Sequence, residues 1–84
     1  MLTLIGDYEL HIAEYVITEP ILTRPKYRYH LQNADGTLIV RWDNAPHHTE
    51  IATFPDHRHK RVDVIKPSSR MNLDEVLNLV LQFI

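Results

Sequence analysis

The clearest pattern in the chain is an alternation of apolar and polar residues through residues 26–43, interrupted near the middle. A period of two is typical of a half-buried strand. The Asp35-Gly36 step at the interruption favours a two-residue turn of type I′, because both central positions of that turn need a positive φ. The pattern therefore predicts an antiparallel hairpin in which Ala34 pairs with Thr37.

This register sorts the hairpin side chains by face. Arg28 lies opposite Asp43 and His30 opposite Arg41, whereas a three-residue turn would pair Tyr29 with Arg41 and mix the two faces. One face then carries the apolar side chains of Tyr27, Tyr29, Leu31, Leu38, Val40 and Trp42. The other face carries the polar side chains of Arg28, His30, Gln32, Arg41 and Asp43.

Weaker signals predict further strands on both sides of the hairpin. Residues 8–17 alternate loosely and are rich in aromatic and β-branched side chains, which favour strands. Residues 1–5 predict a short first strand before them. Residues 58–65 predict a last strand, with Val62 and Val64 on one face.

Residues 72–84 carry the signals of an amphipathic helix. Asn72 is a good N-cap, Glu75 completes a capping box, and Met71 can pack onto Val76. The apolar residues that follow repeat at helical spacing, so we expect them to pack on the apolar face of the sheet. This stripe consists of Leu73, Val76, Leu77, Val80, Leu81 and Ile84.

Together these elements predict an α+β fold, with an antiparallel β-sheet of four to five strands and a C-terminal helix packed on one face. A length of 84 residues suits one domain, so we expect residues 1–84 to form a single domain. The absence of cysteine excludes disulfides and thiolate metal sites. A net charge of −2 does not fit a duplex-DNA binder. Since the sequence has neither a signal-peptide pattern nor a membrane-spanning apolar run, we expect a cytoplasmic protein with no membrane partner.

A dense group of histidines follows the hairpin. His47, His48, His57 and His59 lie within thirteen residues, in and after a stretch that two prolines keep irregular. Neutral imidazoles are ordinary zinc ligands, but this spacing matches no standard zinc module. We therefore expect no metal ligand and no cofactor. Two alternatives stay open: the rings cap turns and bond to backbone carbonyls, or the chain is a small histidine-rich metal-binding protein.

The polar hairpin face offers a second kind of chemistry. If the histidines fold over Arg28, His30, Arg41 and Asp43, one imidazole can act as a general base while arginines hold a phosphate. Such an arrangement can cleave RNA without a metal ion, by activating the 2′-hydroxyl. The simpler interpretation is a solvated sheet face with cross-strand charge pairs. Base stacking on the hairpin aromatics is less favoured, because the helix needs that face for burial.

Three runs of sequence resemble one family closely. They are YHLQNADG at residues 29–36, LIVRWDNAPHH at 38–48 and TFPDHRH at 53–59. These runs are similar to the TumE family of small proteins (the former DUF6516 group), described as toxins of type II toxin–antitoxin pairs. The resemblance implies a toxin-like component with a helix-turn-helix antitoxin as its partner. Ribonuclease action, as in other small toxins, is an analogy that the resemblance adds.

The resemblance and the residue chemistry together define the candidate site. The catalytic candidates are His47, His48, His57, His59, Arg41 and Asp43. The substrate-binding candidates are His30, Arg28, Asn44 and Arg58. RNA is the expected substrate and a homodimer is a further possible assembly. The alternative function is a non-catalytic interaction module that dimerises or binds an antitoxin.

Overall fold

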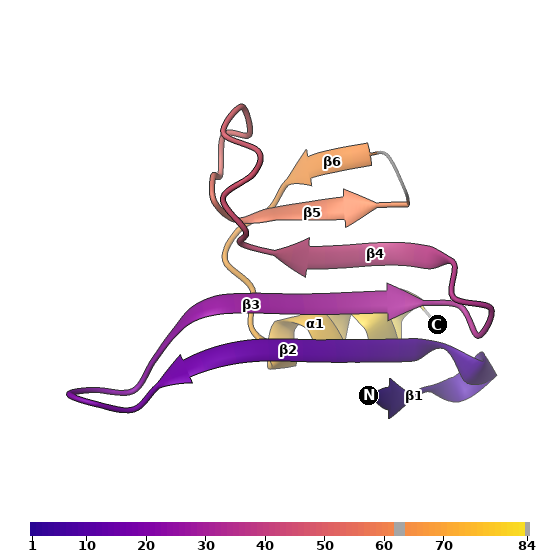
Figure 1. Cartoon of the computed structure of the whole chain (residues 1–84). Coiled ribbons are helices and arrows are strands. Elements are labelled where there is room, and N and C mark those ends of the chain that lie inside the picture. Colours follow the sequence, from indigo (N-terminus) through magenta and orange to yellow (C-terminus); the bar gives the residue numbers. More distant parts are fainter. Residues whose placement is uncertain (62–63, 84) are drawn as a thin grey trace.

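The computed structural model describes residues 1–61 and 64–83. Within them six strands form one antiparallel sheet in chain order, and a single α-helix lies against one face of it (Figure 1). The expected α+β class is confirmed, but the sheet has six strands instead of four to five. The strands are β1 (Leu2–Thr3), β2 (Glu9–Ile17), β3 (Thr23–Gln32), β4 (Leu38–Asp43), β5 (His57–Lys60) and β6 (Val64–Pro67); the helix is α1 (Leu73–Phe83), and the short 3-10 helix η1 (Ile5–Asp7) follows β1.

The β3–β4 hairpin has the expected register but a different turn. Asn33 N–H donates to Thr37 O, Gly36 N–H donates to Asn33 O, and Gly36 takes a φ of 89°. This three-residue loop, with its glycine in the left-handed region, replaces the expected two-residue type I′ turn. A register shift near Leu31 then leaves Ile39 as the extra residue of a bulge.

The bulge explains why the face assignment survives the wrong turn. Arg28 pairs with Asp43, and the next three pairs inward follow the expected register. Nearer the turn, Leu38 lies opposite Gln32 instead of on the apolar face, and Ile39 packs against the core in its place. Two one-residue irregularities therefore cancel, and away from the turn the polar face keeps the composition that its alternation predicted.

The expected strand over residues 58–65 is wrong, because the chain reverses within it. Arg61 adopts a φ of 61°, and its N–H donates to Ile39 O at 3.1 Å. Two short strands result, β5 and β6, paired as a hairpin. The expected position of Val62 lies outside the described residues.

The helix covers the apolar face where the sequence predicts it. Glu75 N–H donates to Asn72 Oδ1 at 2.9 Å, which confirms the N-cap. Leu81 is an exception to the predicted stripe because it is 63% exposed, and Ile84 lies outside the described residues. The buried core consists of Leu10, Tyr27, Tyr29, Leu31, Trp42, Met71, Val76 and Val80.

The irregular segment between β4 and β5 is tied to this core. Tyr27 Oη–H donates to Asp56 Oδ1 at 2.6 Å, and Thr53 Oγ1–H donates to the Asp56 carbonyl at 2.6 Å. Ser68 N–H in turn donates to Thr53 Oγ1 at 2.9 Å. These bonds fix the segment beside the sheet, so its histidines have defined neighbours. In the part of the chain that the structure describes, no helix is both long and apolar enough to cross a membrane.

Candidate active site

The sheet itself gathers the polar candidates into two cross-strand rows. In the first row the directly paired residues are His11, His30, Arg41 and His59. In the second row they are Ala13, Arg28, Asp43 and His57. Side chains of directly opposed residues lie about 5 Å apart at Cβ, and alternate residues share a face. Both rows therefore lie on the face opposite the helix.

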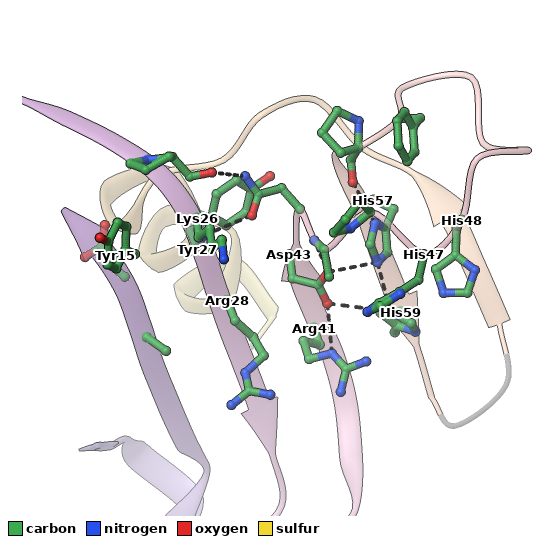
Figure 2. A pocket seen from close by; sticks show the side chains of 18 residues that line it. Tyr15, Lys26, Tyr27, Arg28, Arg41, Asp43, His47, His48, His57 and His59 are labelled. Atoms are coloured by element: carbon green, nitrogen blue, oxygen red, sulfur yellow. Dashed lines mark hydrogen bonds and ion pairs between the residues drawn. The ribbon is translucent and has the colours of Figure 1, made fainter. Parts of the chain in front are cut away.

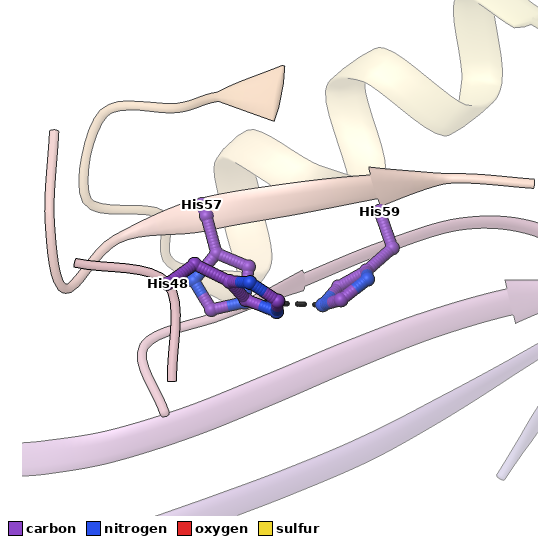
Figure 3. A group of neighbouring side chains, drawn as sticks. All are labelled: His48, His57 and His59. Atoms are coloured by element: carbon purple, nitrogen blue, oxygen red, sulfur yellow. Dashed lines mark hydrogen bonds between the residues drawn. The ribbon is translucent and has the colours of Figure 1, made fainter. Parts of the chain in front are cut away.

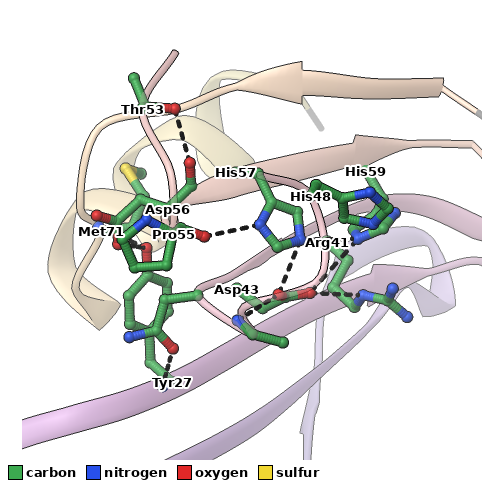
Figure 4. Close-up of polar contacts among 12 residues, drawn as sticks. Tyr27, Arg41, Asp43, His48, Thr53, Pro55, Asp56, His57, His59 and Met71 are labelled. Atoms are coloured by element: carbon green, nitrogen blue, oxygen red, sulfur yellow. Dashed lines mark hydrogen bonds and ion pairs between the residues drawn. The ribbon is translucent and has the colours of Figure 1, made fainter. Parts of the chain in front are cut away.

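Asp43 is the centre of the polar contacts. Its Oδ1 lies 2.9 Å from His57 Nε2, and its Oδ2 lies 3.6 Å from His59 Nε2 (Figure 4). Arg41 Nε–H donates to Oδ2 at 3.1 Å, and Ala45 N–H donates to Oδ1 at 3.0 Å. Asp43 is 5% exposed, so these partners compensate the burial of its carboxylate.

His57 is held on both sides of its ring. Its Nδ1 lies 2.8 Å from Pro55 O, while its Nε2 lies 3.1 Å from His59 Nε2. A carbonyl oxygen accepts and never donates, so Nδ1 carries the hydrogen. Since His57 is 2% exposed, it can orient its neighbours but has little access to a substrate.

The loop before β5 adds a third ring to the cluster. The His48 ring centroid lies 5.0 Å from that of His57 and 5.5 Å from that of His59. Glu50 Oε1 lies 3.4 Å from His48 Nδ1 and orients the ring from the solvent side. The cluster therefore joins a loop residue to two strand residues that follow it by nine and eleven positions in the sequence.

Two histidines of the first row favour the neutral form. Burial lowers the pKa of His59, the Arg41 guanidinium lowers it further, and the Asp43 carboxylate opposes both. Burial likewise lowers the pKa of His30, with a further contribution from Arg41. A neutral imidazole has a free lone pair, which is what a general base or a metal ligand needs.

A hollow of about 920 Å³ lies over this face. Figure 2 shows Arg28 and Arg41 beside Asp43, with the histidines along the next strand and the loop. Most candidates line the hollow: Arg28, Arg41, Asp43, Asn44, His47, His48, His57 and His59. Lys26 and Tyr15 also line it and were missed as site residues. Lys26 is two residues before Arg28 on β3, and this alternation is the signal that could have found it.

Two candidates lie away from the hollow, and a third, Asn44, lines it but binds the backbone. Arg58 pairs with Trp42 and so belongs to the helix-covered face, away from the two rows. Asn44 acts on the backbone, accepting from Tyr27 N–H at 3.0 Å and donating to Pro25 O at 2.8 Å. His30 lies in the first row, next to Arg41, but outside the lining of the hollow. The hairpin aromatics Tyr27, Tyr29 and Trp42 are buried in the core, where bases cannot stack on them.

The fold and this cluster define a small α+β protein with histidine, arginine and aspartate side chains joined on one sheet face. The family model described as Toxin TumE matches residues 1–84, the whole length of the chain. The chain therefore belongs to the TumE toxin family, which confirms the resemblance of its three motifs. Membership supports a toxin-like role, and a toxin family implies an antitoxin partner in general. Searches of curated proteins and of solved structures find no match.

Proposed function

We propose that this protein is a toxin that cleaves RNA at the histidine–arginine cluster, in a reaction that needs no metal ion. The observation that carries the proposal is the placement of His48 and His59 beside Arg41 and Arg28 in one hollow. Neutral imidazoles move protons near neutral pH, and guanidinium groups bind phosphate oxygens. RNA supplies the two groups that this pair can use, a 2′-hydroxyl and an adjacent phosphodiester.

The proposed reaction is an internal transesterification. His59 takes the proton of the 2′-hydroxyl, whose oxygen forms a bond to the adjacent phosphorus. The bond from phosphorus to the 5′-oxygen breaks, and His48 gives that oxygen a proton. The products are a 2′,3′-cyclic phosphate and a 5′-hydroxyl end. Arg41 and Arg28 stabilise the negative charge that grows on the phosphoryl oxygens.

Asp43 and His57 act as positioning residues in this scheme. Asp43 holds Arg41 through Nε, which leaves the outer guanidinium nitrogens free to point at a phosphate. His57, fixed between Pro55 and Asp43, supports the His59 ring from the buried side. The less buried members of the cluster, His48, Arg28 and Arg41, then face the substrate, and His59 lines the same hollow with 9% of its surface exposed.

The test is incubation of the purified protein with a mixed-sequence RNA in the presence of a chelator. We expect cleavage that leaves 2′,3′-cyclic phosphate ends and spares the same sequence with 2′-O-methyl groups. Loss of a general base typically reduces the rate by about 10²- to 10⁴-fold, so His59→Ala should lower the rate of RNA cleavage by about 10²-fold or more. The matched control is His11→Ala, which removes the exposed histidine at the far end of the same row. RNA that stays intact under these conditions would refute the proposal.

A second function, antitoxin binding, is favoured by the end of the β2–β3 hairpin. This end extends past the other strands in Figure 1. Ile21 is 68% exposed and Leu22 is 75% exposed. The neighbouring side chains of Tyr15, Val16 and Ile17 are also exposed and apolar. Apolar side chains gathered in this way are typical of a surface that binds another protein.

We expect this surface to bind the antitoxin, which the resemblance describes as a helix-turn-helix protein. Co-purification with the product of the neighbouring gene tests this. The double variant Ile21→Asp/Leu22→Asp should lose the partner, while Leu81→Asp, an exposed apolar position on α1, should keep it. Equal retention by both variants would exclude the hairpin end as the binding surface. Binding without any RNA cleavage would favour the non-catalytic interaction module.

A further inference from the structure

The buried part of the cluster brings ring nitrogens and carboxylate oxygens, all of which can act as metal ligands, close together. His57 Nδ1 carries its ring hydrogen toward Pro55 O, so a neutral His57 ring has a lone pair at Nε2. That atom lies 2.9 Å from Asp43 Oδ1 and 3.1 Å from His59 Nε2. A lone pair so close to a carboxylate oxygen, which accepts and cannot donate, suits a cation placed among these atoms.

A hydrogen bridges only two of these atoms at a time, whether it comes from His57 or from the His59 ring. If Nε2 of His57 is protonated, its hydrogen points toward either Asp43 or His59. The second carboxylate oxygen still lies 3.6 Å from His59 Nε2, with Arg41 on its other side. A divalent cation in the centre would instead accept lone pairs from both rings and from the carboxylate at once.

The spacing of these atoms fits such an ion. Zinc binds histidine nitrogen and carboxylate oxygen at about 2.0–2.2 Å, which places tetrahedral ligands about 3.3–3.6 Å apart. His57 Nε2 lies 2.9 Å from Asp43 Oδ1 and 3.1 Å from His59 Nε2, a few tenths of an ångström below that range, and His59 Nε2 lies 3.6 Å from the other carboxylate oxygen, at its upper end. The nitrogens of His48, His57 and His59 that could act as ligands all lie within 4.8 Å of one another (Figure 3).

We propose that His48, His57, His59 and Asp43 form a site for one divalent cation of the zinc class. Pro55 O and Arg41 complete its outer layer, since a carbonyl fixes the His57 tautomer and a guanidinium holds the carboxylate. Four protein ligands leave no open position, as in structural zinc sites. This site has a regulatory consequence that rests on the proposed function. A bound ion occupies the ring nitrogens that move protons, so the metal-bound toxin does not cleave RNA.

Zinc binding to the chelator-treated protein tests the site directly. We expect one ion per chain by titration calorimetry, and a visible cobalt(II) spectrum of the tetrahedral type. His48→Ala should weaken binding at least about tenfold. The double variant His11→Ala/His30→Ala removes another histidine pair of the same face, with ring centroids 6.1 Å apart, and should bind as the parent does. Circular dichroism of the metal-free variants establishes that each is folded.

Binding well below one ion per chain, or equal binding by the folded His48→Ala variant, would overturn the site. In the RNA assay, zinc should suppress cleavage, with half of the suppression at the zinc concentration that gives half-maximal binding. A chelator should restore cleavage. Full cleavage by the loaded protein would overturn the silencing. If neither form cleaves RNA while one ion binds with the expected variant pattern, the metal site stands and the proposed ribonuclease function fails.

Discussion

At the scale of single residues, the side of the sheet decides which charges can serve the site. Arg28 and Arg58 have the same chemistry and similar exposure to solvent. Arg28 pairs with Asp43 on the open face, whereas Arg58 pairs with Trp42 on the helix side. Arg58 was among the predicted substrate-binding residues, although strand alternation places it on the face opposite to His57 and His59.

This contrast gives a prediction for RNA binding. With a 2′-O-methyl RNA that resists cleavage, Arg28→Ala should weaken binding and reduce the slope of log affinity against log salt by about 0.7, the value for one phosphate contact on a single strand. Arg58→Ala should leave both quantities as they are. Fluorescence anisotropy at several salt concentrations measures them. Equal losses in the two variants would mean that RNA does not select the open face.

At the scale of elements, local signals predicted more than long-range ones. The helix was predictable because Asn72 and the apolar spacing act within a few residues of each other. The β3–β4 register was predictable from alternation, although its turn was not, because the bulge at Ile39 compensates the longer loop. No glycine or proline marks the reversal at Arg61, so the sequence predicted one strand over residues 58–65 where the structure has the β5–β6 hairpin.

The same limit applies to the histidine cluster. Alternation predicts that His57 and His59 share a face, and that Arg41 and Asp43, two residues apart on β4, share one as well. No local signal predicts that His48 returns over them, because the path of residues 44–56 is set by contacts with Tyr27 and Ser68, far away in sequence. The sequence therefore predicts which strand residues share a face, but it does not predict where the loop places His48.

The helix cap yields a prediction about stability. Asn72→Ala removes the Oδ1 acceptor of the Glu75 N–H bond and should lower the free energy of unfolding by about 1 kcal/mol. Asn78→Ala, at an exposed position inside α1, removes an amide of the same kind from a site where alanine is the better helix former, so it should be neutral or slightly stabilising. Urea denaturation compares the two variants. A similar loss of stability in both variants would contradict the prediction, because the effect of Asn72→Ala would then not come from the cap.

At the scale of the whole molecule, two buried phenols connect the sheet with segments distant in sequence. Tyr27 donates to Asp56 of the loop, while Tyr29 donates to Glu14 Oε2 on β2 at 2.9 Å. Arg24 contacts the Tyr29 hydroxyl and the carbonyl of Met71, just before the helix. The aromatic pair thus helps to fix the loop, the sheet and the helix relative to one another.

These phenols predict that the fold loses stability in alkali. Burial, and then the hydrogen bond to Glu14, raise the pKa of Tyr29 to about 12, and burial together with Asp56 raises the pKa of Tyr27 further. An unfolded tyrosine loses its proton near pH 10, so above that pH the folded state holds more protons than the unfolded state. The free energy of unfolding is therefore complete below about pH 10 and falls as pH rises toward 12, by up to about 1.4 kcal/mol per pH unit for each tyrosine.

Urea denaturation at pH 8, 10 and 11 measures this slope. Tyr29→Phe lowers stability at every pH because it removes the bond to Glu14, so the comparison concerns the slope above pH 10, which the variant should reduce. Tyr15→Phe is the matched control, since Tyr15 is 59% exposed whereas Tyr29 is fully buried. A parent protein equally stable at pH 8 and pH 11 would contradict the prediction. So would a slope that Tyr15→Phe reduces as much as Tyr29→Phe does, because the buried phenols would then not be its source.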